Sequence, residues 1–271
     1  MTRAHGGVGR TPGGGARLPH PFADHFSPLA PAYAAARPSY PAPLFAYLAA
    51  IAPSPRRAWD CGTGNGQAAV QLAAVFEEVT ATDASPEQLA QAPAHPRVTY
   101  RVAPAEARGV ATASMDLVTT AQALHWFDVP AFLAEARRAL VPGGVLAAWC
   151  YGLQRLDDEG LDGVLERFYH ETVGPYWPPE RRLVETGYRT IRFPFEELAA
   201  PAFEMAHEWT LGELLAYLRT WSATARFVLT EGYDPVQPLA ARLTPLWGGA
   251  DLRRRVRWPL SVRVVRAPRP A

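Results

Sequence analysis

Short apolar runs alternate with amphipathic segments through the middle of this chain. Five of the runs have the length and composition of buried strands: 58–60, 79–82, 98–102, 115–120 and 145–150. Segments of helical periodicity separate them, and this alternation predicts a parallel, doubly wound α/β sheet. Residues 203–209 and the alternating run 256–264 add later strands, so we expect about seven strands in total.

Capping residues mark where several helices begin. Ser85, followed by Pro86 and Gln88, places an N-cap, a first-turn proline and a capping-box partner in register. Thr210 with Glu213 forms a second capping box, and residues 128 and 234 mark two further starts. Nearer the N-terminus, prolines at 38, 41 and 43 divide the segment 22–51, and this pattern predicts two helices that meet at a corner.

The length and composition fit one domain. With 271 residues and 48% hydrophobic content, the chain can bury one large core. Residues 1–20 are rich in glycine, proline and arginine, and we expect a flexible tail there. The single domain would then cover 21–271: a cofactor-binding core over 21–150, substrate-shaping segments over 151–250 and a final strand over 255–266.

The charge pattern excludes several kinds of partner and chemistry. There are 27 basic and 26 acidic residues, mixed along the chain, so no broad field for nucleic acid or an anionic membrane is predicted. The basic run at 253–257 fits a solvated strand edge better than a binding patch. No lysine occurs anywhere, which excludes a Schiff-base lysine and a Walker lysine. The histidines lack metal-ligand spacing, so we predict no metal.

Cysteine usage and hydropathy indicate the compartment. Cys61 and Cys150 each end an apolar run, and we expect both to be reduced and buried. The first twenty residues lack the apolar segment of a signal peptide, and no apolar stretch reaches about eighteen residues. A cytoplasmic protein is the expectation.

The stretch from Asp60 to Gly66 carries most of the functional information. Gly62, Gly64 and Gly66 follow a strand and precede a helix, where the chain must turn sharply and its backbone must approach a ligand closely. Asp83 lies nineteen residues after Gly64 at the end of the next strand, in position to accept hydrogen bonds from ribose hydroxyls.

The spacing of the third glycine separates two cofactor classes. A dinucleotide site would place it at position 67, where this chain has Gln67. Here it is Gly66, and Asp60 precedes the first glycine. Without a pyrophosphate to neutralise, an acidic group can face a ligand ammonium, which favours S-adenosylmethionine over NAD.

From residue 58 to residue 66 the chain resembles the first motif of the class I methyltransferases, in the group called methyltransferase type 11. Four further segments are similar to the motifs of this family: 82–85, 105–106, 115–118 and 140–144. The resemblance implies a Rossmann-like, seven-stranded, mostly parallel sheet with helices on both faces, an antiparallel last strand and an N-terminal helical lid. It covers residues 22–150 closely and the rest loosely.

The resemblance also implies which residues bind S-adenosylmethionine. By it, Tyr33 and Arg37 would help to close the cofactor site. The full expected set is Tyr33, Arg37, Asp60, Gly62, Thr63, Gly64, Gly66, Asp83, Ala84, Ala105, Glu106 and Gln122.

Tyr33 with the segment 37–41, the segment 122–127 after the fourth strand, and the segment 218–222 resemble the trans-aconitate methyltransferases. His125 is either a base or hydrogen bonder for the acceptor, or a residue packed under Trp126 without a chemical role. Trp126, Arg219 and Trp221 are the expected substrate-binding residues, and Trp126 would wall the pocket. If the helix that begins after Thr210 extends through Arg226, both arginines lie near one face and could hold a carboxylate acceptor.

Two other functions fit parts of this pattern. A nicotinamide-dependent oxidoreductase would share Gly62, Gly64 and Asp83, and a non-catalytic protein could bind S-adenosylmethionine without an acceptor pocket. The displaced third glycine argues against the oxidoreductase, and the 125–126 and 219 regions argue against a non-catalytic protein. We predict a monomer or homodimer acting on a small-molecule methyl acceptor, with no nucleic-acid or membrane partner.

Overall fold

The computed structural model describes residues 38–107 and 109–269. Its centre is one sheet in the order β3, β2, β1, β4, β5, β8 and β6, with β7 also paired to β8. The strands are β1 (Arg57–Cys61), β2 (Glu78–Asp83), β3 (Val98–Val102), β4 (Met115–Ala121), β5 (Leu140–Tyr151), β6 (Glu196–Leu198), β7 (Phe203–Trp209) and β8 (Arg254–Arg266).

The strand directions agree with the predicted topology. Strands β1 to β5 pair in parallel, whereas β8 runs antiparallel to β5. Strands β6 and β7 pair with opposite halves of β8 and share the seventh position across the sheet. The described residues therefore contain one strand more than we expected, while the seven-position, mostly parallel sheet with an antiparallel last strand is confirmed.

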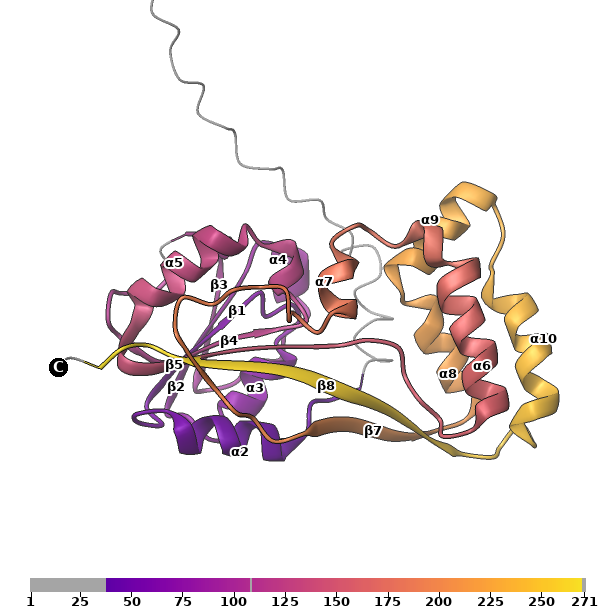
Figure 1. Cartoon of the computed structure of the whole chain (residues 1–271), viewed down its shortest axis with the longest axis horizontal. Helices are drawn as coiled ribbons and strands as arrows, with labels where there is room; N and C mark the ends of the chain where they lie inside the picture. The colour runs from indigo at the N-terminus through magenta and orange to yellow at the C-terminus, as the bar shows by residue number, and fades with distance from the viewer. Residues whose placement is uncertain (1–37, 108, 270–271) are drawn as a thin grey trace, which may run out of the picture.

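Helices cover both faces of the sheet, as predicted (Figure 1). Helices α2 and α3 pack on one face, and α5 and α7 contribute to a separate core on the other. Four helices, α6, α8, α9 and α10, stand together at one end, reached by the long strands β7 and β8. The helices are α2 (Ala42–Ile51), α3 (Gln67–Leu72), α4 (Pro86–Leu89), α5 (Val129–Ala139), α6 (Glu159–Arg167), α7 (Arg181–Glu185), α8 (Leu211–Arg219), α9 (Ser222–Glu231) and α10 (Val236–Trp247).

The predicted caps are present where the capping bonds are local. Ser85 accepts from the Gln88 backbone N–H, and Thr210 and Glu213 form the full capping box. The Ser85 backbone N–H donates to Asp83, so the side-chain half of the predicted box at Gln88 is replaced by a bond to the end of β2. These caps satisfy N–H groups that a helix start would leave unpaired.

The helix that begins after Thr210 is shorter than one of our predictions required. Helix α8 ends at Arg219, and Trp221, in an extended conformation, is the N-cap of a new helix, α9. Residues 219 and 226 therefore do not share one helix, and the prediction that they lie on one face of it is wrong. The tail, and the first of the two helices expected before residue 51, lie outside the described residues.

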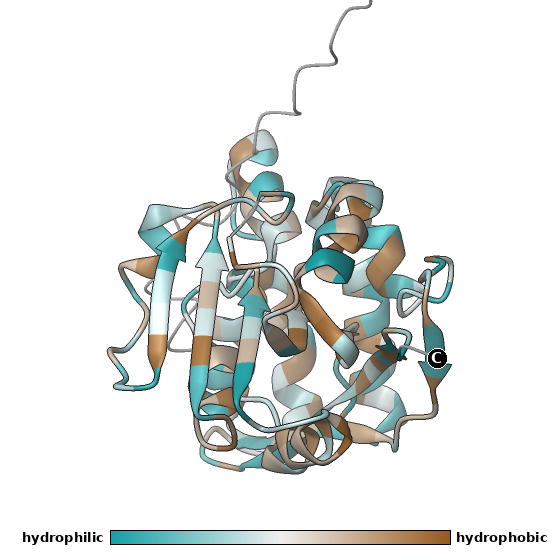
Figure 2. Cartoon of the chain, turned by 90° about the vertical axis from the view of Figure 1, so that its left-hand side faces the viewer, coloured by the Kyte–Doolittle hydropathy of each residue, from teal (hydrophilic) through white to brown (hydrophobic). Residues whose placement is uncertain are grey.

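One edge of the sheet gathers the ends of the parallel strands. The glycine-rich loop follows β1, Asp83 ends β2 and Gln122 follows β4. Figure 2, turned by 90°, shows strands side by side with their ends at a common edge. In open α/β sheets, ligands bind at this carboxyl edge. Cys61 and Cys150, predicted to be buried thiols, are buried and free in the strands β1 and β5.

Candidate functional site

The loop after β1 has a backbone conformation that requires its glycines. Gly62, Gly64 and Gly66 have φ angles of 69°, 57° and 82°. Any residue with a Cβ would pay about 1–2 kcal/mol in this left-handed region. The backbone N–H groups of Gly62 and Thr63 both donate to the Thr82 carbonyl, at 2.8 and 3.0 Å. The loop is thereby anchored to the neighbouring strand β2.

Space around the three glycines differs in a way that fits a bound ligand. A Cβ on Gly62 would lie 2.7 Å from Ala123 Cβ and 2.8 Å from Phe127 Cζ, and one on Gly66 would lie 2.6 Å from the Tyr100 hydroxyl. Within residues 38–107 and 109–269, a Cβ on Gly64 would meet only the Gln88 side chain, at 3.8 Å. Gly62 and Gly66 thus pack against the protein, whereas Gly64 faces open space that a nucleoside could approach.

Asp83 lies where the sequence predicted a ribose-binding carboxylate. Its Oδ2 accepts from the Gly64 N–H at 2.8 Å, and its Oδ1 accepts from the Ser85 N–H at 2.9 Å. These two bonds fix the carboxylate between the glycine loop and the start of α4, with Ala84 between its two anchors. A preoriented acceptor beside the glycine loop suits the two hydroxyls of a ribose.

Asp60 lies beneath the loop. Its carboxylate is fully buried and accepts from the Thr63 and Thr119 hydroxyls at 2.6 and 2.8 Å. Burial raises the pKa of this carboxyl to about 6, against the lowering effect of the two threonines. The geometry supports a role in holding the loop, and contact with a ligand ammonium stays a prediction.

Two more predicted cofactor residues tie neighbouring loops to the same edge. Exposed Glu106 accepts from the Asp128 backbone N–H at 2.9 Å, which connects the segment after β3 to the start of α5. Ala105 beside it is buried. The other two residues expected to close the site, Tyr33 and Arg37, lie outside the described residues.

Gln122 has an unusual backbone for its residue type. Its φ is 54°, and its side-chain amide pairs with both backbone groups of Tyr151, donating at 3.1 Å and accepting at 2.8 Å. The side chain thus extends the pairing of β4 with β5 beyond the end of β4. Strained residues of this kind persist where surrounding contacts hold them, and they cluster at functional sites.

His125 lies in the short 3₁₀ turn η2 (Leu124–Trp126), directly after β4. It is buried, and its Nδ1 lies 3.0 Å from the Tyr188 hydroxyl. Burial, and then the positive charge of Arg181, lower the pKa of His125 to about 3. A neutral, hydrogen-bonded imidazole of such low basicity supports the packed role over that of a general base.

Tyr188 is a residue that our sequence reasoning missed. It is fully buried, has a φ of 58° and presents its hydroxyl to His125. Burial raises the pKa of this phenol well above its usual value. No local pattern could have identified this pair, because 63 residues separate its members.

The predicted aromatic residues belong to two separate groups of contacts. Trp126 is half-buried beside His125, with ring centroids 4.7 Å apart. Trp221 is buried in the helical end of the molecule, where its ring lies 5.7 Å from Tyr169 and 5.5 Å from Trp177. Tyr169 and Trp177 were not predicted, and they supply most of this second group.

Arg219 does not enter an aromatic pocket. Its side chain is 47% exposed, and its Nε donates to Asp234 at 2.8 Å. An exposed arginine already paired with a carboxylate is poorly placed to hold an acceptor. The structure therefore gives Arg219 a surface ion pair, and the predicted substrate-binding role has no geometric support.

The arginine run near the C-terminus also forms ion pairs. The pairs are Arg253 with Glu213, Arg254 with Asp158, Arg255 with Glu204, and Arg257 with Asp157 and Glu204. This agrees with a solvated strand edge. Within 38–107 and 109–269, no cluster of three or more His, Cys, Asp or Glu side chains could hold a metal. In the same ranges no helix combines the length and apolar character needed to cross a bilayer.

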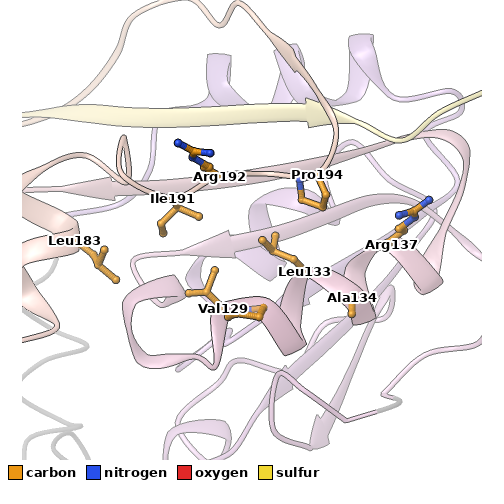
Figure 3. Close-up of a pocket in the computed structure, with 9 residues that line it drawn as sticks. Val129, Leu133, Ala134, Arg137, Leu183, Ile191, Arg192 and Pro194 are labelled. Atoms are coloured by element: carbon orange, nitrogen blue, oxygen red, sulfur yellow. The ribbon is translucent and has the colours of Figure 1, made fainter.

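A surface groove of about 590 Å³ lies apart from the glycine loop (Figure 3). It runs between α5, α7 and the segment 191–194, with Leu133 and Ile191 on its floor and Arg137 and Arg192 at its rim. None of the predicted cofactor or substrate residues lines this groove. The predicted cofactor residues that the structure describes lie instead along the carboxyl edge of the sheet.

Comparison with known proteins agrees with this geometry. The family model described as a methyltransferase domain matches residues 59–148. A protein of Dictyostelium discoideum described as a methyltransferase is 32% identical over 194 residues, which are 71% of this chain and 74% of the relative. The methyltransferase cfoB of Aspergillus candidus is 30% identical over 158 residues, 51% of this chain and 49% of that relative.

Among solved structures, one described as a type II methyltransferase from Anaeromyxobacter dehalogenans is similar over most of the chain. The two share 47% sequence identity and superpose with a TM-score of 0.81. The alignment covers 86% of this chain and 99% of the other. The likeness thus includes the helical end, which the family model does not reach.

Proposed function

This chain belongs to the class I, S-adenosylmethionine-dependent methyltransferases, and we propose that it methylates a carboxylate oxygen of a small molecule. Because the chain belongs to this family, we set aside the alternative that it is a nicotinamide-dependent oxidoreductase. The proposal adds the acceptor atom, and the observation that carries it is that His125 beside η2 is buried and hydrogen-bonded to the equally buried Tyr188.

The donor half of the reaction follows from the loop after β1. The nucleoside of S-adenosylmethionine would occupy the space next to Gly64 and would be bound by the oriented carboxylate of Asp83. When bound, this donor supplies a methyl group whose carbon forms a bond to the acceptor oxygen as its bond to sulfur breaks, and the electron pair of that bond stays on sulfur. The protein then has to position the acceptor and exclude water. Positioning alone can contribute effective molarities of about 10⁵ to 10⁸ M.

Three titratable side chains packed at η2, those of His125, Cys150 and Tyr188, are poorly suited to act as a base. His125 has a pKa of about 3 and is engaged with Tyr188. Burial raises the pKa values of Cys150 (to about 12) and Tyr188, so both remain neutral at pH 7. A phenol or an ammonium group must lose a proton before or during transfer, whereas a carboxylate is already ionised. A carboxylate acceptor therefore needs none of these groups as a base.

The surroundings favour a small acceptor with an apolar body. Trp126 beside η2 and Trp177 in the helical end are half-buried rings that such a body could contact. The balanced net charge of +1 supplies no field for nucleic acid or an anionic membrane. We also expect the protein to act in the cytoplasm as a monomer or homodimer.

A transfer assay with S-adenosylmethionine labelled at the methyl group tests the proposal. The panel contains tricarboxylates, fatty acids, aromatic acids, phenols and amines at equal concentration. We expect label in one or more carboxylic acids and in neither phenols nor amines. Transfer to phenols or amines alone would refute the carboxylate acceptor and leave the family membership unaffected.

A further inference from the structure

Arg181, at the start of α7, differs from the other half-buried arginines of the described chain. It has no carboxylate in ion-pair contact, and its one hydrogen bond uses Nε. The other four N–H groups of its guanidinium have no partner within residues 38–107 and 109–269. By contrast, the half-buried Arg138, Arg254, Arg257 and Arg263 form ion pairs with carboxylates, and Arg266 donates to two backbone carbonyls.

Two aromatic side chains hold this guanidinium in place. Its central carbon lies 4.5 Å above the Trp177 ring centroid, and its Nε donates to the Tyr169 hydroxyl at 3.0 Å. The same hydroxyl donates to Glu185 at 3.2 Å. Glu185 is four residues after Arg181, where a helix normally forms an ion pair. The phenol instead lies between them, so the guanidinium is oriented but its charge is not neutralised.

Helix α7 is fixed at the edge of the sheet where the donor site lies. It packs against η2 and β5. The Cys150 thiol, in β5, lies 3.8 Å from the Val184 carbonyl of α7, and Tyr188, just after α7, reaches His125. Phe127, the residue that follows η2, packs next to Gly62. A continuous set of contacts therefore runs from the glycine loop through η2 to α7.

A second unused donor lies on the ring beneath Arg181. The Trp177 indole N–H is buried and has no hydrogen-bond partner within the described ranges. Leaving such a group unsatisfied costs about 1–3 kcal/mol. An oxygen atom of a ligand bound next to Arg181 would remove this cost. The four unused guanidinium N–H groups and the indole N–H are donors suited to an acceptor with negative or partial negative charge.

We propose that Arg181, stacked on Trp177, binds a carboxylate group of the methyl acceptor. This rests on the function proposed above and replaces Arg219 with Arg181 as the cation that recognises the acceptor. A guanidinium remains charged at every working pH and presents planar N–H pairs that match a carboxylate. The half-buried Trp177 would contact the apolar body that carries this group, with Tyr169 and Trp221 packed behind it.

Calorimetric titration of the protein saturated with S-adenosylhomocysteine tests the proposal. The probes are citrate and benzoate, with benzamide as the neutral counterpart of benzoate. Arg181→Gln is compared with Arg182→Gln, a change of equal charge at the adjacent, exposed residue. We expect Arg181→Gln to weaken carboxylate binding at least tenfold and Arg182→Gln to change it less than twofold. Affinity for S-adenosylhomocysteine should stay within twofold in both variants.

A second variant keeps the test informative if Arg181→Gln does not fold. Trp177→Phe retains a ring under the guanidinium and removes the indole N–H, and we expect it to weaken benzoate binding about three- to tenfold without affecting benzamide. Wild-type protein that binds neither acid, or an Arg181→Gln variant that binds both as wild type does, would overturn the proposal. Arg181-dependent binding without methyl transfer to any acid would support this subsite and contradict the proposed reaction. Methyl transfer to an acid that is equally fast in wild type and in Arg181→Gln would support the proposed reaction and contradict this subsite.

Discussion

The donor loop and the α7 region use different kinds of interaction to build a site. Residues 60–85 are held by backbone groups: two N–H groups on the Thr82 carbonyl, and two more on the Asp83 carboxylate. Around α7 the contacts join side chains from distant segments, such as Tyr169 with Arg181 and His125 with Tyr188. The first site follows from local chain geometry, and the second exists only after the two parts of the fold have packed together.

This difference predicts that the donor side and the acceptor side can be altered independently. Changes to α7 or to its aromatic neighbours replace side chains without altering the backbone path of the glycine loop. Conversely, the loop tolerates little change, since its turns require positive φ angles. Substitutions in the two regions should therefore have separable effects on donor and acceptor.

The largest expected effect is at Gly62, on the donor side. Gly62→Ala combines a left-handed φ with clashes at Ala123 and Phe127, and should lower the free energy of unfolding by about 2–5 kcal/mol. Gly64→Ala has a similar φ but open space, so its cost should be only about 1–2 kcal/mol. Urea unfolding of both variants measures the difference. Equal losses would contradict the assignment of Gly64 to the ligand-facing side.

The next effect concerns the pH dependence of stability at His125. The folded pKa of about 3 lies below the usual 6.5, so the contribution of His125 is fully present above pH 6.5 and is lost as the pH falls. The loss should be about 1.4 kcal/mol per pH unit below 6.5. His125→Gln removes this contribution to the pH dependence of the unfolding free energy. The difference in unfolding free energy between wild type and variant should therefore shrink by about 3 kcal/mol from pH 7 to pH 4.5. Parallel pH profiles would indicate that His125 keeps its usual pKa in the folded protein and would restore it as a candidate base.

A smaller change is expected at Asp83. Asp83→Ala removes the carboxylate assigned to the ribose, and should weaken binding of S-adenosylhomocysteine by about 1.5–3 kcal/mol, or ten- to a hundredfold. Binding of benzoate to the loaded protein should remain unchanged, which sharpens the separation of the two sites. An unchanged dissociation constant for S-adenosylhomocysteine would reduce Asp83 to a structural role in the loop.

The smallest effect is expected at Arg219. Exposed ion pairs contribute about 0–1 kcal/mol, and the side chain of Arg219 is 47% exposed beside Asp234. Arg219→Ala should therefore leave stability, donor affinity and the Michaelis constant of the acceptor nearly unchanged. A large rise in that Michaelis constant alone would return Arg219 to the acceptor site and weaken the case for Arg181.

The same contrast decides what the sequence could predict. The glycine turns, the strand ends and the caps at Ser85 and Thr210 depend on residues a few positions apart, and the structure contains them. The break at Trp221 has no proline or glycine to signal it. There the packing of the indole against Tyr169 and Trp177 accompanies the new helix start, and these partners are more than forty residues away. Arg181 was missed for the same reason, because its unpaired state is visible only when all its neighbours are known.

The stability of the transferred label toward mild alkali tests the central claim most directly. Methyl esters of carboxylic acids release methanol under mild base, whereas methyl groups on phenol oxygen or on nitrogen do not. After reaction with methyl-labelled S-adenosylmethionine and the best acceptor from the panel, we predict that alkali converts the label to volatile methanol. Label that stays in the non-volatile fraction would contradict methylation of a carboxylate.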